Sequence, residues 1–253
     1  MICNTFKRLA LDTWDKIAKS RTVGFQLKEE TLTDLNMLDL KVRHPYEISV
    51  QVFNKAEEGE HGADWEWWFT DKTKKWLGFR VQAKIISITN DRFAHLHYRK
   101  DDKSLHQCDL LILKAGMGTH KTIPIYCLFV QTDDLTKLAT TYTAGTTSEV
   151  LGCSLLSADA VQKLRPAKKL KDTNAMIPWH LLVCKPDNKD VLEHLTDFIG
   201  SKLGIIIQEE DYLADEPPHY VSRLVFNQGE VSSEGEQSTG LAGVMVYQDN
   251  ASI

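Results

Sequence analysis

The sequence lacks any uninterrupted apolar run of the roughly 18 residues that a membrane-spanning helix requires. The first residues, Met1 to Arg8, lead into alternating apolar and charged positions rather than into the apolar stretch of a secretory signal. Cysteine is also scarce: the five cysteines are odd in number and widely spaced, which predicts no disulfide framework and a reducing compartment. We therefore expect a cytoplasmic protein that has no membrane partner.

Several common functional motifs are missing as well. The chain contains no Walker A loop, no Gly-x-Ser-x-Gly elbow, no Gly-x-Gly-x-x-Gly fingerprint and no internal repeat. Phosphate-cradling loops and serine-type acyl transfer are thereby excluded. What is present is the composition of an ordinary globular protein, with 253 residues, 42% of them hydrophobic and 26% charged. This length suits one large domain, or a core with a smaller appendage.

Acidic charge is unevenly distributed along the chain. The segment from Ile207 to Ile253 contains nine Asp or Glu residues and a single basic residue, Arg223, so its formal charge is −8. Because the whole chain carries −5, residues 1–206 carry about +3. This balance permits contact with phosphate in the first part of the chain but does not require it. The acidic end is typical of a solvated surface.

Hydrophobic periodicity predicts a mixed α/β fold. In the first half, two helices are followed by three strands, a helix and a buried strand. We expect them at Phe6–Ala18, Lys28–Lys41, Ile48–Phe53, Gly62–Phe69, Phe79–Ile86, Leu105–Lys114 and Ile123–Val130, in that order. The second half predicts helices at Ala158–Leu164 and Asp187–Gly204, with Asp187 as N-cap, and a strand at Pro178–Val183. We divide the chain into a core, residues 1–135, and a C-terminal α/β extension, residues 136–253, that completes or decorates it.

The most informative residues lie on the second and third of these expected strands, Gly62–Phe69 and Phe79–Ile86. Asp64 lies on the first arm of a predicted β-hairpin, and Gln82 and Lys84 lie on the second. Since side chains alternate along a strand, Gln82 and Lys84 share a face. If the hairpin register brings Asp64 to that face, a carboxylate, an amide and an ammonium group converge. Such a set can bind one divalent metal and act on a phosphodiester.

This pattern resembles the PD-(D/E)XK nuclease superfamily, which has the restriction-endonuclease-like fold. The resemblance rests on a helical acidic residue, a strand Asp after Gly62-Ala63, and Gln-x-Lys on the next strand; the Gln variant is similar to that of Mrr-type restriction endonucleases. The run Gly-Ala-Asp-Trp-Glu-Trp-Trp also resembles that of a bacterial family of unknown function. The match covers about Phe25 to Val130. Two departures weaken the likeness: no Pro precedes Asp64, and Gln82 replaces the commoner acidic residue.

The resemblance implies a restriction-endonuclease-like mixed sheet flanked by helices, and a DNA endonuclease of a defence or restriction type. It implies Asp64, Gln82 and Glu30 as ligands of Mg²⁺, with Mn²⁺ as a substitute, and Lys84 as the residue that orients water or offsets charge. Periodicity alone leaves Glu29 and Glu30 open as the helical carboxylate. The implied partners are nucleic acid, most simply DNA, and either a second copy of the chain or an activating protein, since one such site cuts one bond at a time.

Other interpretations compete with this one. A nuclease-like fold without activity could serve as a nucleic-acid-binding or protein-interaction module, and a zinc-stabilised protein could use His95, His97, His106 and Cys108. Glu66 could assist a second metal or pair with a lysine. The tryptophans that flank it could stack on bases, although packing is the commoner role of strand aromatics.

Overall fold

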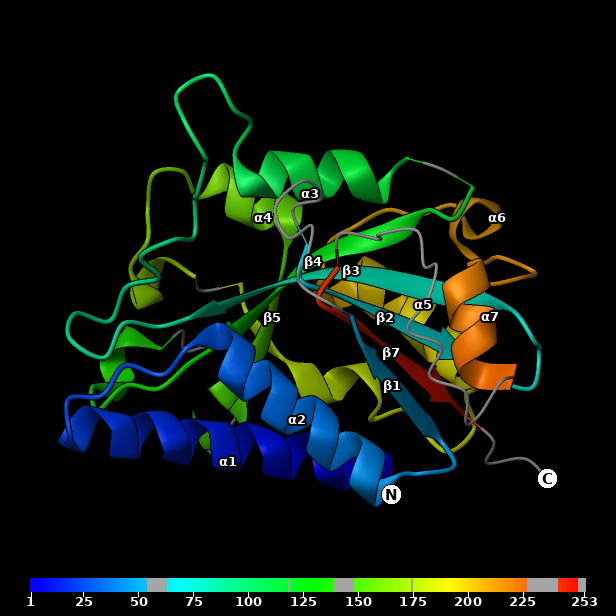
Figure 1. Cartoon of the computed structure of the whole chain (residues 1–253), viewed down its shortest axis with the longest axis horizontal. Coiled ribbons are helices and arrows are strands. Elements are labelled where there is room, and N and C mark those ends of the chain that lie inside the picture. The colour runs from blue at the N-terminus through cyan, green and yellow to red at the C-terminus, as the bar shows by residue number, and fades with distance from the viewer. Residues whose placement is uncertain (54–62, 118, 139–147, 174, 227–240, 250–253) are drawn as a thin grey trace. The chain divides into compact units, whose positions relative to one another are not determined.

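The computed structural model describes residues 1–53, 63–117, 119–138, 148–173, 175–226 and 241–249, and confirms the mixed α/β class (Figure 1). The predicted loop from Asn54 to Gly62 therefore lies outside the described residues. The helices are α1 (Ile2–Thr22), α2 (Glu29–Arg43), α3 (Gln107–Ala115), α4 (Ala158–Lys163), α5 (Val191–Lys202), α6 (Glu209–Tyr212) and α7 (His219–Phe226). The strands are β1 (Ile48–Val52), β2 (Trp65–Thr70), β3 (Trp76–Ile85), β4 (Thr122–Phe129), β5 (Cys153–Ser157), β6 (Ile177–Pro178) and β7 (Gly243–Gln248).

The seven strands form a mixed sheet in the order β1-β7-β2-β3-β4-β5-β6. The last strand of the chain, β7, enters the sheet between β1 and β2; it runs antiparallel to β1 and parallel to β2. In the first half of the chain, all the predicted elements are confirmed within a few residues: α1, α2, β1, the β2–β3 hairpin, α3 and β4. No helix among the described residues is long and apolar enough to cross a membrane.

The chain divides into two compact units. Unit 1 comprises residues 1–36, 83–110 and 125–184, and unit 2 comprises residues 37–82, 111–124 and 185–253. The proposed division at residue 135 stays a prediction.

The core of unit 1 forms around α1. The periodic apolar residues of this helix are buried, among them Phe6, Leu9 and Ile17. Trp179 packs its ring 4.6 Å from that of Phe6 and donates its indole N–H to the Phe6 carbonyl oxygen at 2.8 Å. Gly152 lies so close to the helix that a Cβ atom there would come 2.0 Å from the Ala10 carbonyl oxygen. Only glycine permits this approach.

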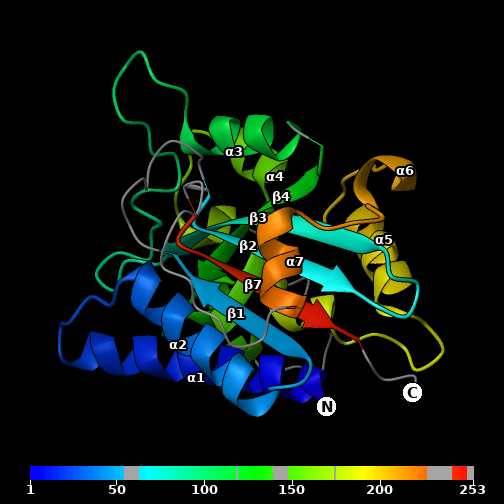
Figure 2. The same ribbon diagram turned by 45° about the vertical axis from the view of Figure 1, so that its right-hand side comes forward.

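The core of unit 2 forms on one face of its strands. Trp68 of β2 packs with Val244 and Val246 of β7 and with Val221 and Val225 of α7. Figure 2 shows α7 lying over β1 and β7. Burial of this apolar face is the main stabilisation of α7, which with eight residues is too short to be stable alone.

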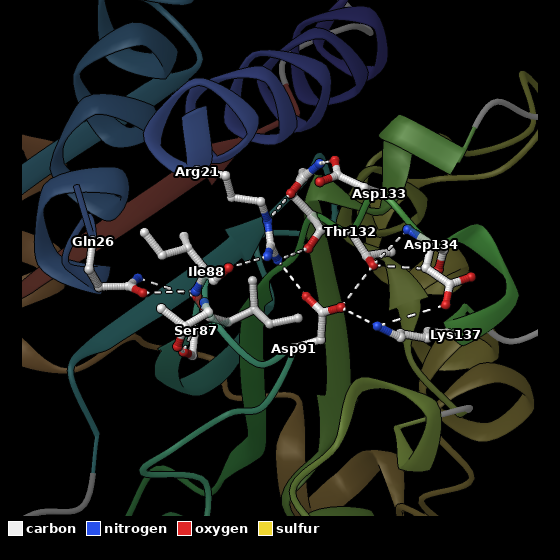
Figure 3. A network of polar contacts seen from close by, with 12 residues as sticks. Arg21, Gln26, Ser87, Ile88, Asp91, Thr132, Asp133, Asp134 and Lys137 are labelled. Atoms are coloured by element: carbon white, nitrogen blue, oxygen red, sulfur yellow. Dashed lines mark hydrogen bonds and ion pairs between the residues drawn. The ribbon is translucent and has the colours of Figure 1, made fainter. Parts of the chain in front are cut away.

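A polar network connects three distant segments of unit 1 (Figure 3). Arg21, in the last turn of α1, donates to the Ile88 carbonyl oxygen at 2.5 Å, to Asp91 at 2.6 Å and to the Gln131 carbonyl oxygen at 2.7 Å. Asp91 also accepts from Lys137 at 2.7 Å. Burial alone would raise the pKa of Asp91, but the hydrogen bonds from Lys137 and Arg21 outweigh it and hold the pKa below its usual value.

Two local predictions for the second half are wrong. The strand predicted at Pro178–Val183 is limited to Ile177–Pro178 and continues as a 3₁₀ helix, Trp179–Leu182, because Trp179 turns inward to reach α1. The N-cap of α5 is Asp190 rather than Asp187. Gly204 follows the helix with a φ of +65°, which is the left-handed conformation that glycine favours after a helix.

The expectation that no cysteine forms a disulfide is also wrong. Cys3 in α1 and Cys184 after the 3₁₀ helix are bonded to each other, across a sequence separation of 181 residues. The spacing of the cysteines in the sequence could not reveal this pair. The two residues come together only because α1 packs against Trp179–Leu182. The other cysteines, Cys108, Cys127 and Cys153, are buried free thiols.

We predict that Arg21→Ala lowers the free energy of unfolding by about 2–4 kcal/mol, because it leaves the partly buried Asp91 without its guanidinium partner. Lys19→Ala, at an exposed position in the same helix, is the matched control and should cost less than about 0.5 kcal/mol. Urea denaturation measures both. Because the pKa of Asp91 is lowered on folding, the wild-type advantage should be complete above about pH 4 and shrink at lower pH. Equal stability of the two variants would show that the network contributes nothing.

A thiol titration of the denatured, unreduced protein should detect Cys108, Cys127 and Cys153 only. Reduction should then lower the free energy of unfolding by about 2–5 kcal/mol, since it releases a long closed loop in the unfolded chain. The double variant Cys3→Ser, Cys184→Ser should not respond to the reductant. Five reactive thiols in the unreduced protein would contradict the disulfide.

Candidate functional site

The site begins with the register of the β2–β3 hairpin. The two strands pair antiparallel, with Trp65 opposite Val81 and Glu66 opposite Arg80. The turn between them is anchored by Asp71, which accepts hydrogen bonds from the Thr73 backbone N–H at 2.9 Å and from the Leu192 backbone N–H at 3.1 Å. Asp71 thus ties the hairpin turn to the start of α5. One consequence is that the residues before β2 lie beside the end of β3.

Asp64 and Gln82 are in direct contact, as the sequence predicts. The Gln82 side-chain nitrogen donates to Asp64 Oδ2 at 2.5 Å. The backbone of Asp64 is held on both sides: its N–H donates to the Val81 carbonyl oxygen at 2.9 Å, and its carbonyl oxygen accepts from Ala242 at 2.7 Å. Gln82 is 2% exposed, whereas Asp64 is only half-buried. Gln82 is therefore one fixed, buried partner of a side chain that remains partly exposed.

The remaining predicted residues lie on β3 and α2. Lys84 follows Gln82 by two positions in β3, so both side chains leave the strand on the same face, and Lys84 is 7% exposed. A buried ammonium group requires partners, which makes Lys84 unusual among the lysines of the chain. Glu29 and Glu30 both lie in the first turn of α2, and Glu30 is exposed.

The contacting groups suit a hard cation. Asp64 offers a carboxylate, and Gln82, whose amide nitrogen donates to it, carries an amide oxygen as well; oxygen atoms are the ligands that Mg²⁺ prefers. The contact between Asp64 and Gln82 contains a single carboxylate, so by itself it is not a complete set of ligands for Mg²⁺. Over the described ranges of the chain, no three His, Cys, Asp or Glu side chains are grouped to hold a metal.

Within the described ranges, no grouping of ligands supports the zinc interpretation. His97 Nε2 hydrogen-bonds to the Ala167 carbonyl oxygen at 2.8 Å, and His106 Nδ1 hydrogen-bonds to the His97 carbonyl oxygen at 3.0 Å. One ring nitrogen of each of these two histidines is thus used in a backbone contact. Burial raises the pKa of the Cys108 thiol, which disfavours the thiolate that zinc requires. These residues shape a loop instead.

Glu66 is a structural carboxylate. It is 2% exposed and accepts from Arg80 at 2.8 and 3.1 Å, from the Trp68 indole at 3.0 Å, and from the Tyr220 hydroxyl. Burial, and then the neighbouring Glu66 charge, raises the pKa of Tyr220 far above its usual value, so the phenol stays protonated and donates. With its oxygens occupied in this way, Glu66 has no capacity for a second metal. Its cationic partner is the partly buried Arg80 rather than the surface lysine that the sequence suggested.

The tryptophans of β2 pack in the interior. Trp65, Trp67 and Trp68 are 3%, 2% and 1% exposed. Stacking of nucleic-acid bases on these rings is therefore excluded, and the packing interpretation is confirmed.

Glu66, Arg80, Trp68 and Tyr220 together form what we call the Glu66 cluster. The sequence did not lead us to predict Arg80 or Tyr220 as members of it. Arg80 could have been found by counting back from the hairpin turn, which places it opposite Glu66. Tyr220 gave no signal, because it lies 154 residues away and comes from α7.

The free thiols are no candidates for nucleophilic chemistry, since burial raises the pKa of Cys153 to about 12 and that of Cys127 well above its usual value.

Comparison with known proteins identifies a family and no characterised relative. A model described as "Family of unknown function (DUF6615)" matches residues 2–252. No curated protein matches the chain.

The Glu66 cluster yields a prediction about stability rather than activity. Arg80→Met should cost about 3–5 kcal/mol in the free energy of unfolding, because it leaves a buried carboxylate without its cation. Adding Glu66→Gln to this variant should recover part of the loss, since the charge is then removed too. Urea denaturation of the two variants provides the measurement. A double variant that is no more stable than Arg80→Met would contradict the pairing.

Proposed function

We propose that this chain, which belongs to the DUF6615 family of unknown function, is a metal-dependent nuclease of the PD-(D/E)XK type. The observation that carries the proposal is the contact between Asp64 and Gln82, followed on β3 by the buried Lys84. A carboxylate, an amide and an ammonium group on neighbouring strands form the set that the resemblance requires. The order of elements supports it too, since α2, β1, β2, β3, α3 and β4 follow one another as in that superfamily's core.

Each residue has a task in phosphodiester hydrolysis. Mg²⁺ held by Asp64 and Gln82, with Glu30 as the helical ligand, would supply Lewis-acid activation of the scissile phosphate. Gln82 fixes the orientation of the Asp64 carboxylate through its hydrogen bond. Lys84 orients the attacking water and offsets the negative charge that grows on the phosphate oxygens in the transition state. Burial strengthens this effect, because water screens the ammonium charge less there.

DNA is the proposed substrate, cut internally, in a role of the restriction or anti-phage defence type. This part of the proposal comes from the resemblance. We place the protein in the cytoplasm because such substrates are found there; the bond between Cys3 and Cys184 removes the argument from cysteine spacing. We expect a second copy or a protein partner to take part when both strands are cut.

A second function is favoured by one observation. The Gln82 amide nitrogen, a neutral donor, occupies the position of the carboxylate that most of these nucleases use, which leaves one negative charge fewer for a cation. A chain with this site but without metal affinity would act as a nucleic-acid-binding module rather than as an enzyme. Metal-dependent cleavage separates the two functions.

We predict that the wild-type protein nicks or linearises supercoiled plasmid, or degrades single-stranded DNA, with Mg²⁺ or Mn²⁺, and that EDTA abolishes this activity. Asp64→Asn and Lys84→Met should each reduce the rate by about 10²-fold or more, because the first removes the carboxylate that would hold the metal and the second removes the cation that offsets the phosphate charge. Asp102→Asn, at a fully exposed loop position, is the control and should cut normally. Thermal unfolding should confirm that every variant is folded.

Equal activity of all the proteins would reveal a contaminating nuclease. Folded wild-type protein that cuts neither substrate with either metal would contradict the proposal. Glu66→Gln should retain cleavage if it folds, since Glu66 is assigned to the interior.

A further inference from the structure

Two segments of unit 1 that are far apart in the sequence pair through their backbones. The Phe93 N–H donates to the Lys168 carbonyl oxygen at 2.9 Å, and the Leu170 N–H donates to the Asp91 carbonyl oxygen at 3.0 Å. Between these bonds, Arg92 and Lys169 lie opposite each other in an antiparallel bridge. The backbone of both segments is therefore fixed at this point.

Alternation along the two segments separates apolar from basic side chains. Phe93 and Leu170 are 0% and 1% exposed and anchor the pair in the core. Arg92 and Lys169, between them, are exposed. Two cations directly opposite each other on paired strands repel and destabilise the pairing. The fold thus holds like charges together at a cost, on the solvent side of a rigid element.

The surrounding residues add to this charge. Lys163, Lys168 and Lys171 lie in the same segment as Lys169, and together with Arg92 they define a basic ridge. Among the described residues, Arg92, Lys163, Lys169 and Lys171 form no ion pair.

Three of the nearby acidic side chains, Asp91, Asp109 and Asp172, already have hydrogen-bond partners. Asp91 pairs with Arg21 and Lys137, and Asp109 accepts from Arg165 at 2.8 and 2.9 Å. Asp172 accepts from the Lys169 backbone N–H at 3.1 Å.

The basic ridge also stands out against the charge of the molecule. Unit 1 contains 17 Lys or Arg and 14 Asp or Glu, a formal charge of +3, whereas the whole chain carries −5. An exposed aromatic side chain lies in the adjoining turn: Tyr98 is 49% exposed, and His97 of this turn hydrogen-bonds to the Ala167 carbonyl oxygen beside Lys168. Cations beside an accessible ring suit a polymer that carries both phosphates and bases.

We propose that the basic ridge, Arg92, Lys163, Lys168, Lys169 and Lys171, binds the phosphodiester backbone of a nucleic acid. The inference rests on the proposed function and extends it, because it assigns substrate binding to residues that take no part in the chemistry. Binding of this kind is independent of base sequence and is driven by release of counterions from the phosphates.

The test is fluorescence anisotropy with a labelled 30-base-pair duplex and a labelled 30-nucleotide single strand, in EDTA so that nothing is cleaved. The wild-type protein is compared with the triple variant Arg92→Gln, Lys169→Gln, Lys171→Gln. The matched control is Lys7→Gln, Lys28→Gln, Lys202→Gln, which removes the same charge from exposed positions elsewhere.

We expect the ridge variant to bind at least 10-fold more weakly, and its slope of log K against log salt to fall by about 2 to 3 for the duplex. The control variant should bind within about 2-fold of the wild type.

Equal weakening in the two variants, or none in the ridge variant, would overturn the inference. The inference would also be overturned if the wild-type protein bound vesicles of anionic phospholipid or polyglutamate but no nucleic acid, and if the ridge variant lost that binding.

The failure of each proposal is recognisable. Ridge-dependent binding by a wild-type protein that does not cut would support the ridge and overturn the nuclease. If the wild-type protein cuts DNA and the ridge substitutions change neither its affinity for DNA nor its cleavage rate, only the proposal about the ridge is overturned.

Discussion

The antiparallel register of β2 and β3 is the constraint on which the candidate site depends. With Trp65 opposite Val81, Glu66 faces Arg80 and Asp64 reaches Gln82. A slip of one residue would turn every side chain of β2 to the other face of the sheet. Glu66 would then be buried without its cation, and the tryptophans would lose their packing. The same register thus fixes the core of unit 2 and the contact between Asp64 and Gln82.

The polar groups near this hairpin fall into two kinds. Glu66, Arg80 and Tyr220 satisfy one another inside a layer of tryptophan and valine, so their contribution is to fix the register and the position of α7. Asp64 is different, because its carboxylate is half-exposed while the Gln82 beside it is buried. A carboxylate that is held in place yet partly exposed can take up an external ligand. That contrast supports a structural role for Glu66 and agrees with the proposed metal-binding role of Asp64.

Local patterns in the sequence predicted more than distant contacts did. Periodicity located α1, α2 and the hairpin, and alternation along β3 placed Gln82 and Lys84 on one face, because these features depend on neighbouring residues. The bond between Cys3 and Cys184, the inward turn of Trp179 and the reach of Arg21 to Asp91 all join segments far apart in the chain. No spacing rule encodes such contacts, since they arise only when whole elements pack. The second half of the chain was predicted less well for this reason.

The central claim is that Asp64 belongs to a site for one divalent cation, and isothermal titration of the folded protein with Mn²⁺ tests it most directly. The account predicts about one bound ion per wild-type chain and none for a folded Asp64→Asn variant, since that substitution removes the carboxylate and keeps the side-chain shape. Equal binding by the two proteins, or no binding by the wild type, would contradict the claim.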